Sequence, residues 1–234
     1  MPIASRCSQI LKIVSRFGRV SVTDLSEQLN FSVETIRRDL KKLGEQGDIV
    51  RVHGGAVSKN YLDEGTSFNN RAGNNVDDKK YLVEQAISHF CEGAVIGLDA
   101  SSSSWLVAHA LPDVRCTVVT NSINNINALS GKKNVSVVSV GGYYSEKYKA
   151  FYGLIARNAL MDMSLDICVI SCVGFDMESG VWDSNEYNYE IKKILIDISN
   201  SVLLIADKSK FRKRGLLKIC NLNDVDILVS NADL

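Results

Sequence analysis

Apolar residues in the first forty-five positions recur at the spacing of three short amphipathic helices. Helices are expected up to Gly18, over residues 22–29 and over residues 32–43. Ser21 and Ser32 stand at the starts of the second and third helices, where a serine side chain can accept a hydrogen bond from an unpaired backbone amide. Only residues 30–32 separate these two helices, and this short break is typical of a helix-turn-helix.

Two short apolar strands follow the third helix, which Gly47 is expected to end. The strands, residues 49–52 and 56–57, flank the sequence His53-Gly54-Gly55, and a glycine pair between two strands indicates a tight hairpin turn. Three helices followed by a basic hairpin predict a winged helix-turn-helix domain over residues 1–58.

From Asp77 onward apolar strand patterns alternate with helical patterns, which predicts an α/β domain with a mostly parallel sheet over residues 77–234. Strands are expected at 94–98, 116–119, 135–140, 167–173, 202–206 and 227–229, and helices at 81–91, 102–110, 124–129, 150–161 and 186–198. Residues 59–76 contain five Asn and almost no apolar periodicity, so they are expected to form a linker. Phe68 and Arg71 interrupt its polar character and are expected to pin it to one domain.

The overall charge of zero conceals an asymmetry between the two parts of the chain. Residues 1–60 carry ten Lys/Arg and six Asp/Glu, whereas the remainder carries seventeen and twenty-one. Because nucleic-acid phosphates attract positive charge, only the first part has a surplus suited to DNA. The acidic remainder is expected to bind something else.

The six cysteines are scattered, and several lie inside apolar runs, so buried thiols are expected rather than disulfides or a metal site. The sequence has no apolar run long enough to span a membrane, and its first residues lack the apolar core of a signal peptide. We therefore expect a cytoplasmic protein with no cofactor and no membrane partner.

Polar residues and glycines follow several of the expected strands, and parallel sheets bind ligands at the carboxyl ends of their strands. Asp99 and the four serines 101–104 lie between a strand and a helix, where hydroxyl groups and free amides favour a phosphate group. Serines are also ordinary helix caps, and this alternative stays open. The polar strand ends together predict a pocket for a polar small molecule with an anionic group.

Several segments carry a family resemblance: residues 32–40, 51–56, 98–103, 120–122, 141–142 and 206–211. Through these segments, the sequence resembles the DeoR family of bacterial transcription regulators, and the resemblance covers nearly its whole length. The resemblance implies a C-terminal domain related in fold to ribose 5-phosphate isomerase that senses a phosphorylated sugar. The chain departs from many members at residues 101–103, where it has three serines in place of Gly-Thr-Thr. Residues 99–105 and 181–185 are most similar to regulators of fucose operons, which implies an activator that responds to L-fuculose 1-phosphate.

For the DNA-binding domain, the expected partner is double-stranded operator DNA, read by a homo-oligomer because helix-turn-helix proteins usually bind paired half-sites as dimers. Thr35 and Arg38 are expected to contact base edges, since the start of a recognition helix reaches deepest into the major groove. Phosphate contacts are expected from Arg37, Lys41, Arg51 and His53. The cap residue Ser32 is also expected to belong to the DNA-binding surface. His53 could instead serve only the structure of the turn.

For the sensor domain, Asp99 is expected to accept hydrogen bonds from sugar hydroxyls, and Ser101, Ser102 and Ser103 to hold the phosphate. The pocket would be completed by residues at four further positions along the chain: Thr120, Asn121, Gly141, Gly142 and Lys210. Lys210 could instead form a structural ion pair with Asp207 or Asp99.

A working sugar-phosphate isomerase with an attached DNA-binding domain is the alternative function. Such isomerisation needs a base at the substrate carbon and a group that polarises the carbonyl. In the isomerases a lysine and a glycine-rich loop follow the strand that here ends at Gly174, and residues 181–186 contain neither. We therefore expect no catalytic residues, and His89 and His109 are expected to be packing or surface residues.

Overall fold

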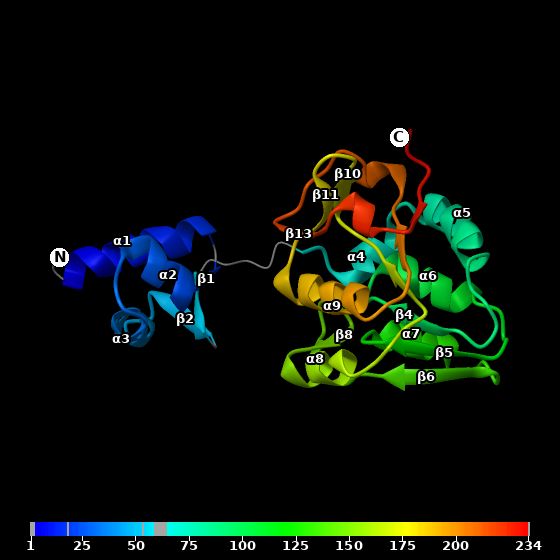
Figure 1. Cartoon of the computed structure of the whole chain (residues 1–234), viewed down its shortest axis with the longest axis horizontal. Coiled ribbons are helices and arrows are strands. Elements are labelled where there is room, and N and C mark those ends of the chain that lie inside the picture. The colour runs from blue at the N-terminus through cyan, green and yellow to red at the C-terminus, as the bar shows by residue number, and fades with distance from the viewer. Residues whose placement is uncertain (1–2, 18, 53, 59–64, 234) are drawn as a thin grey trace. The chain divides into compact units, whose positions relative to one another are not determined.

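The computed structural model describes residues 3–17, 19–52, 54–58 and 65–233. The chain divides into two compact units, one up to Asp63 and the other from Glu64 onward. Figure 1 shows the two units, coloured from blue at the N-terminus to red at the C-terminus. Each unit has its own buried apolar core, so each is described by itself.

The first unit is a winged helix-turn-helix, as predicted. Its helices are α1 (Ile3–Phe17), α2 (Val22–Leu29) and α3 (Val33–Glu45), and its strands are β1 (Arg19–Ser21), β2 (Ile49–Val52) and β3 (Gly55–Ser58). The strands form an antiparallel sheet in the order β1-β3-β2, in which β1 was not predicted because three residues carry too little pattern. Ile10, Leu25 and Leu40 bring the apolar faces of the three helices into one core.

The turn between α2 and α3 depends on local hydrogen bonds. Asn30 ends α2 in the left-handed conformation, with φ 54°, which asparagine tolerates better than most residues. Ser32 then begins α3, and its hydroxyl accepts a hydrogen bond from the Thr35 amide at 3.3 Å. This geometry sets the direction in which α3 leaves the turn.

The second unit is built on six parallel strands in the order β14-β12-β9-β4-β5-β6. They are β4 (Val95–Leu98), β5 (Cys116–Thr120), β6 (Val135–Ser139), β9 (Ile167–Ile170), β12 (Val202–Ile205) and β14 (Ile227–Val229). Its helices are α4 (Phe68–Gly73), α5 (Val76–Ile87), α6 (Ser102–Ala110), α7 (Ile123–Leu129), α8 (Leu154–Met161) and α9 (Glu186–Asp197), with short 3₁₀ turns at Lys208–Lys210 and Leu222–Asp224. The expected α/β class and all six expected parallel strands are confirmed.

Two small antiparallel sheets complete this unit. One pairs β7 (Tyr143–Ser145) with β8 (Ala150–Tyr152), and the other joins β10 (Gly174–Asp176), β11 (Gly180–Asp183) and β13 (Leu217–Cys220). The expected helix over 150–161 is wrong in its first part, because Tyr152 pairs with Tyr143 and Gly153 turns the chain with φ 87° before α8 begins.

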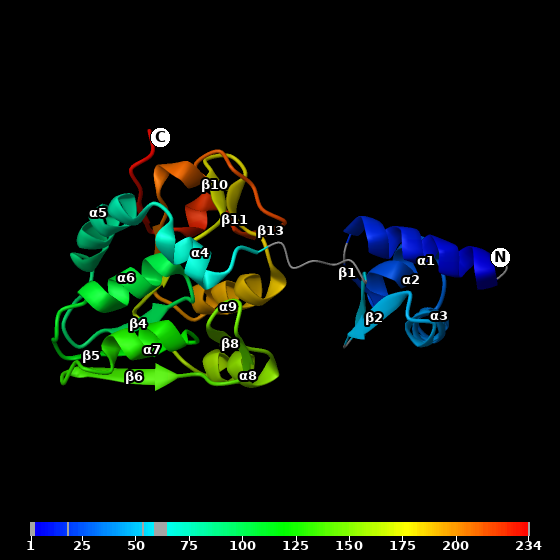
Figure 2. The ribbon, with the colours of Figure 1, turned by 180° about the vertical axis from the view of Figure 1, so that it is seen from behind.

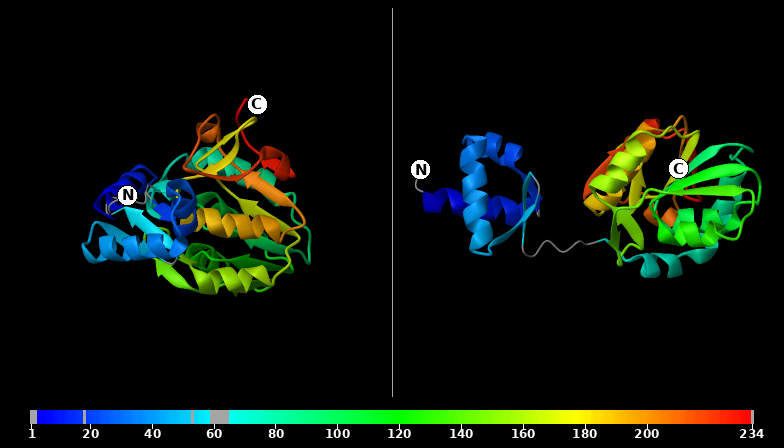
Figure 3. Two further views of the ribbon diagram at one scale, coloured as in Figure 1. Left: turned by 60° about the vertical axis from the view of Figure 1, so that its left-hand side comes forward. Right: turned by 90° about the horizontal axis from the view of Figure 1, so that it is seen from below.

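The six-stranded sheet is covered on both faces because its strands alternate their side chains between two cores. Leu203 and Ile205 of β12 pack with α5, α6 and α7, whereas Val202 and Leu204 pack with α8 and α9. The two groups of helices lie on opposite sides of the sheet in Figures 2 and 3. Strands buried on both faces explain the nearly continuous apolar runs in the sequence.

The expected linker over 59–76 is too long. It contains α4 and the first residue of α5, and Phe68 is buried against the second unit, where its ring meets Trp105 edge-on at 5.8 Å. The expectation that Phe68 and Arg71 pin this segment to one domain is confirmed, because Arg71 also donates a hydrogen bond to the Ala100 carbonyl at 3.3 Å.

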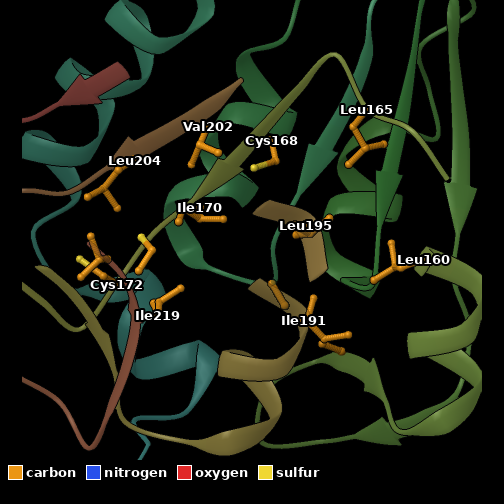
Figure 4. Close-up of a cluster of buried hydrophobic side chains, with 14 of the residues drawn as sticks. Leu160, Leu165, Cys168, Ile170, Cys172, Ile191, Leu195, Val202, Leu204 and Ile219 are labelled. Carbon is orange, nitrogen blue, oxygen red and sulfur yellow. The ribbon is translucent and has the colours of Figure 1, made fainter. Parts of the chain in front are cut away.

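Gly97 of β4 allows α9 to approach the sheet closely. A Cβ atom at this position would lie 2.6 Å from Leu165 Cδ1 and 3.2 Å from Leu195 Cδ2. Figure 4 shows Leu165 and Leu195 in the core between the sheet and the helices. The packing of Leu165 and of Leu195 from α9 against β4 therefore leaves little room for a side chain at position 97.

We predict that Gly97→Ala lowers the free energy of unfolding of the second unit by roughly 1–3 kcal/mol, because the core must shift to admit one methyl group. Both tryptophans, Trp105 and Trp182, lie in this unit, so their fluorescence in a denaturant titration reports its unfolding. Gly131→Ala is the control, since a Cβ there meets nothing within 4 Å. Equal stabilities of the two variants would contradict the packing argument.

Candidate functional site

The outer face of α3 carries the expected DNA-binding residues. Arg37, Arg38 and Lys41 are exposed, and the Thr35 hydroxyl lies 2.9 Å from the hydroxyl of Ser32. Arg37 pairs with Glu34 at 3.6 Å and Lys41 with Glu45 at 3.9 Å. Arg38 has no ion-pair partner among the residues that the structure describes, so its guanidinium is available to an incoming ligand.

A buried ion pair fixes the orientation of α3. The Arg6 guanidinium of α1 binds both carboxylate oxygens of Asp39, with Nη2 to Oδ1 at 3.0 Å, and lies 4.7 Å from the centre of the Phe31 ring. Asp39 points inward while its neighbours Arg37 and Arg38 point outward, so the pair holds the basic face of α3 toward solvent. The sequence analysis did not assign this role to Asp39, because an acidic residue within a basic helix gives no sign of burial.

The hairpin supports the same face. Arg51 of β2 is exposed, and its stem lies against α3, since a Cβ at Gly44 would come within 2.9 Å of Arg51 Cγ. The expected contact residue His53 lies outside the described residues.

A second candidate site lies where the strand order of the parallel sheet reverses. After β4 the chain adds β5 and β6 on one side, and it then returns to add β9 and β12 on the other side. The loops that leave β4 and β9 therefore diverge, and ligands of such sheets bind in the resulting crevice. A cavity of about 210 Å³ lies at this position.

The cavity walls come from the ends of β4, β9 and β12, from the segment around α4 and from the start of α9. The main polar residues of the wall are Arg71, Asn75, Lys79, Ser101, Ser102, Ser171, Asp183, Asn185, Asn188, Lys192, Asp207 and Lys210. Four of them are cations and two are carboxylates, which leaves an excess of two positive charges. Such a wall favours an anionic ligand.

Two lysines illustrate the electrostatics of the cavity. Burial, together with the nearby Lys210, lowers the pKa of Lys79 to about 8, and its ammonium donates to the carbonyls of Arg71 and Asn74 at 2.5 and 2.6 Å. Burial also disfavours the charge of Lys192, but Asp183 and Asp99 outweigh burial and raise the pKa of this lysine. Lys192 is therefore a fixed cation at neutral pH, whereas Lys79 can respond to a neighbouring charge.

Three buried polar atoms in the wall have no hydrogen-bond partner within the described residues: Arg71 Nε, Asn185 Nδ2 and Asp207 Oδ2. Asn185 is only 3% exposed, and its Oδ1 accepts a hydrogen bond from the Asn188 amide, so only its Nδ2 remains available. Because unsatisfied buried polar atoms are costly, they indicate where a polar ligand is expected to bind.

Three of the predicted effector residues line the cavity: Ser101, Ser102 and Lys210. Lys210 donates to the Ser171 hydroxyl at 2.8 Å and lies 4.0 Å from Asp207, so the suggested contact with Asp207 is present at long range.

Asp99 and Ser103 are almost completely buried and do not form part of the cavity wall. Asp99 accepts hydrogen bonds from the amides of Ser101 and Ser171, each at 3.0 Å, and Lys192 lies 3.4 Å away. Burial opposes its ionisation, but Lys192 and these hydrogen bonds hold the pKa of Asp99 below its usual value. In contrast with the expected contact to a ligand, Asp99 supports the loops that form the wall.

The ends of β5 and β6 do not reach the cavity, so the expected contributions of Thr120, Asn121, Gly141 and Gly142 differ from the observed wall. The Thr120 hydroxyl donates to the Leu98 carbonyl at 2.7 Å, and Asn121 Nδ2 donates to the Phe151 carbonyl at 3.0 Å. Sequence reasoning treated all strand ends alike, whereas the residues of the wall follow β4, β9 and β12 and not β5 or β6. It also missed Lys192 and Asn188, which α9 places at the cavity.

A winged helix-turn-helix joined to an α/β unit with an anion-favouring cavity defines a DNA-binding regulator with a sensor domain. Residues 6–61 match the model of the DeoR-like helix-turn-helix domain, and residues 74–232 match that of the DeoR C terminal sensor domain. The chain belongs to the DeoR family of transcriptional regulators.

Two relatives match almost the entire chain. The L-fucose operon activator of Haemophilus influenzae is 43% identical over 96% of this chain and 90% of its own length. The uncharacterized HTH-type transcriptional regulator YulB of Bacillus subtilis is 38% identical over 100% and 91%. Ribose 5-phosphate isomerase A from Neisseria gonorrhoeae is 19% identical and has a TM-score of 0.44 over 58% of this chain and 53% of its own.

Within the described part of the chain, no helix has the length and apolar character needed to cross a membrane.

We predict that Asp39→Asn weakens binding to specific and scrambled DNA alike. The substitution leaves the buried Arg6 charge without its counter-ion, and breaking a buried pair typically costs about 3–5 kcal/mol. Amide hydrogen exchange over α3 should accelerate while exchange over the second unit stays unchanged. The double variant Arg6→Met, Asp39→Leu is the control and should recover slow exchange. A variant Asp39→Asn with unchanged exchange over α3 would show that the pair does not hold this helix.

Proposed function

We propose that this protein regulates a sugar-utilisation operon in response to a phosphorylated sugar that binds in the cavity of the second unit. The observation that carries this proposal is the wall itself, which has excess positive charge and buried donors of Asn185 and Arg71 that find no partner among the described residues. The cavity volume of about 210 Å³ is below the roughly 300–1,000 Å³ of sites for drug-sized ligands, and this small volume suits a small metabolite.

The two sides of the cavity suit the two parts of such a ligand. Ser101 caps α6, and the start of that helix together with Lys79 and Lys210 favours the phosphate. Asn185 Nδ2 and Asp207 Oδ2 offer one donor and one acceptor for sugar hydroxyls. In this arrangement Asp99 acts through Lys192 and the two loops rather than by touching the sugar.

L-fuculose 1-phosphate is the proposed effector, and activation is the proposed response. Both proposals draw on the relative named L-fucose operon activator, which matches nearly the entire chain. Regulation requires that the effector bind the DNA-competent and incompetent arrangements with unequal affinity.

For DNA, we propose that Thr35 and Arg38 contact base edges, whereas Ser32, Arg37, Lys41 and Arg51 contact phosphates. The exposure of Arg38 and its place one turn from the start of α3 support the first role. A homo-oligomer with two such helices would read paired half-sites. Contact by His53 stays a prediction.

We propose that the cavity binds its ligand without converting it. A lysine that acts as a general base must be able to lose its proton near neutral pH. Lys192 lies beside Asp183 and Asp99, which raise its pKa, and is therefore held in the charged form. The pKa of Lys79 is lowered to about 8, but its ammonium is directed at the backbone carbonyls of Arg71 and Asn74. The two relatives reported above are also named as regulators rather than enzymes.

The phosphate assignment is tested by Ser102→Glu, which adds a carboxylate at the start of α6. We expect titration calorimetry with L-fuculose 1-phosphate to show at least a tenfold loss of affinity, because two anionic groups would share one site. The variant should still bind operator DNA. Ser102→Gln is the matched control, since it has nearly the same size without the charge, and it should retain most of the affinity. Equal losses in the two variants would attribute the effect to size and remove the support for a phosphate at this position.

The DNA assignment is tested by comparing neighbouring arginines. Arg38→Ala should cost roughly 1–3 kcal/mol on the cognate site and much less on scrambled DNA, as expected for a base contact. Arg37→Ala should weaken both by similar factors, as expected for a phosphate contact. Fluorescence anisotropy at one salt concentration measures the affinity of each variant for each of the two duplexes. The same uniform loss for Arg38→Ala would assign it to the phosphate backbone instead.

A further inference from the structure

The helix α4 occupies a position that the proposed function does not yet use. It is the first helix of the second unit, so it stands next along the chain to the segment that leads from the DNA-binding unit. Figure 1 labels α4 at this point of the chain. Thr66, Arg71, Asn74 and Asn75, all from the same short segment, line the cavity. One wall of the effector cavity is thus made by the part of the chain closest to the DNA-binding unit in sequence.

The attachment of α4 to its unit is largely polar. Phe68 is its one buried apolar side chain. The Phe68 ring meets Trp105 of α6 edge-on, and the Arg71 guanidinium lies 5.9 Å from the centre of the Tyr148 ring. Two hydrogen bonds add to these contacts: the Phe68 amide donates to the Lys147 carbonyl at 2.8 Å, and Arg71 Nη2 donates to the Ala100 carbonyl at 3.3 Å. Lys79 caps the end of the helix through two carbonyls. Among the described residues, α4 is thus held by one buried aromatic side chain together with polar contacts.

Like charges gather where α4 meets the cavity. Arg71 of α4, Lys79 of α5 and Lys210 all line it, and Lys210 and Arg71 both contribute to the lowered pKa of Lys79. The carboxylates that face this group from neighbouring elements are Asp207 and Asp183, and Asp183 is already paired with Lys192. Lys210 and Arg71 therefore act on Lys79 as like charges, and Asp207 offsets part of their repulsion. A bound phosphate would reverse this repulsion.

We propose that α4 transmits effector binding to the DNA-binding unit: the phosphate draws Arg71 and Lys79 together, and α4 becomes fixed against the cavity. This inference rests on the proposed function, because it takes a phosphorylated sugar as the ligand. Arg71 Nε, which is buried and lacks a partner in the described part of the chain, is the atom through which α4 contacts the ligand. Fixing α4 changes where and how firmly the chain toward the DNA-binding unit is anchored.

The energetic requirement for this mechanism is met within the cavity. An effector shifts an equilibrium only by the difference in its affinity for the two states. A state with α4 fixed offers the ligand both Arg71 of α4 and Lys79 of α5, whereas a state with α4 released keeps only Lys79 in place. Couplings between sites typically correspond to 5–150-fold changes in affinity, which is within the reach of one or two charged hydrogen bonds.

Amide hydrogen exchange of the full-length protein tests the proposal directly. L-fuculose 1-phosphate, and inorganic phosphate as the smallest probe, should slow exchange over residues 68–73 at least tenfold. Exchange over α8, which does not line the cavity, should not change. Slowed exchange at the ends of β4 and β9 without any change over α4 would overturn the role of α4 while leaving the proposed function intact.

Two variants separate ligand binding from its transmission. Arg71→Met should still bind L-fuculose 1-phosphate, with reduced affinity, but at saturation its affinity for operator DNA should change less than twofold. Arg157→Met is the matched control, because Arg157 is an exposed arginine of α8 outside the cavity, and it should respond like the wild type. A full DNA response in Arg71→Met at saturation would overturn the proposal.

Insertion of Gly-Ser-Gly between Asp63 and Glu64 tests the connection itself. Binding of the sugar phosphate in calorimetry and of operator DNA in anisotropy should each persist, while the effect of one on the other should disappear. The same insertion after Gly131, at the turn that follows α7, should leave that effect in place. If the wild type binds neither L-fuculose 1-phosphate nor inorganic phosphate, the proposed function fails and this inference fails with it. If it binds and both insertions respond equally, only the inference fails.

Discussion

The second unit depends on one buried cation that joins four parts of the fold. Lys192 extends from α9 to Asp183 at the end of β11 and to Asp99 in the loop after β4, and Asp99 in turn accepts the Ser171 amide that follows β9. Buried charges persist only where they are paired and hydrogen-bonded, so each of these groups needs the others. The network holds the two diverging loops at a fixed separation. The cavity has a defined shape because Lys192 and Asp183 form part of its wall and Asp99 supports them from behind it.

The DNA-binding unit uses the same principle on a smaller scale. Arg6 and Asp39 form a buried pair in the core of this small unit. The apolar residues of such a small core would not hold it rigidly by themselves. In both units a charged side chain that points inward sets the position of the polar side chains that point outward. The exposed basic face of α3 and the positive cavity are therefore both supported by internal ion pairs.

Much of the fold could be predicted from the sequence because its signals are local. Apolar periodicity, Ser32 as a cap and the Gly54-Gly55 turn are contained within a few residues, and the structure has the corresponding elements. The cavity could be predicted only in part. Ser101 and Ser102 follow a strand in the sequence, but the exclusion of Thr120 and Gly142 depends on strand order, and the contribution of Lys192 depends on how α9 packs. Such relations join residues that lie far apart along the chain, and no short pattern encodes them.

The cavity wall has two sides of different origin. Arg71 and Lys79 come from the segment that begins the second unit, whereas Asn185 and Asn188 come from the cap and first turn of α9. Under the proposed function, substitutions at the start of α9 would alter which sugar is accepted without disturbing Arg71 and Lys79, which are closer in sequence to the DNA-binding unit. A protein divided in this way can acquire a new inducer while keeping its operator and its switching behaviour. The start of α9 is accordingly the region to randomise when such a regulator is converted into a biosensor for another metabolite.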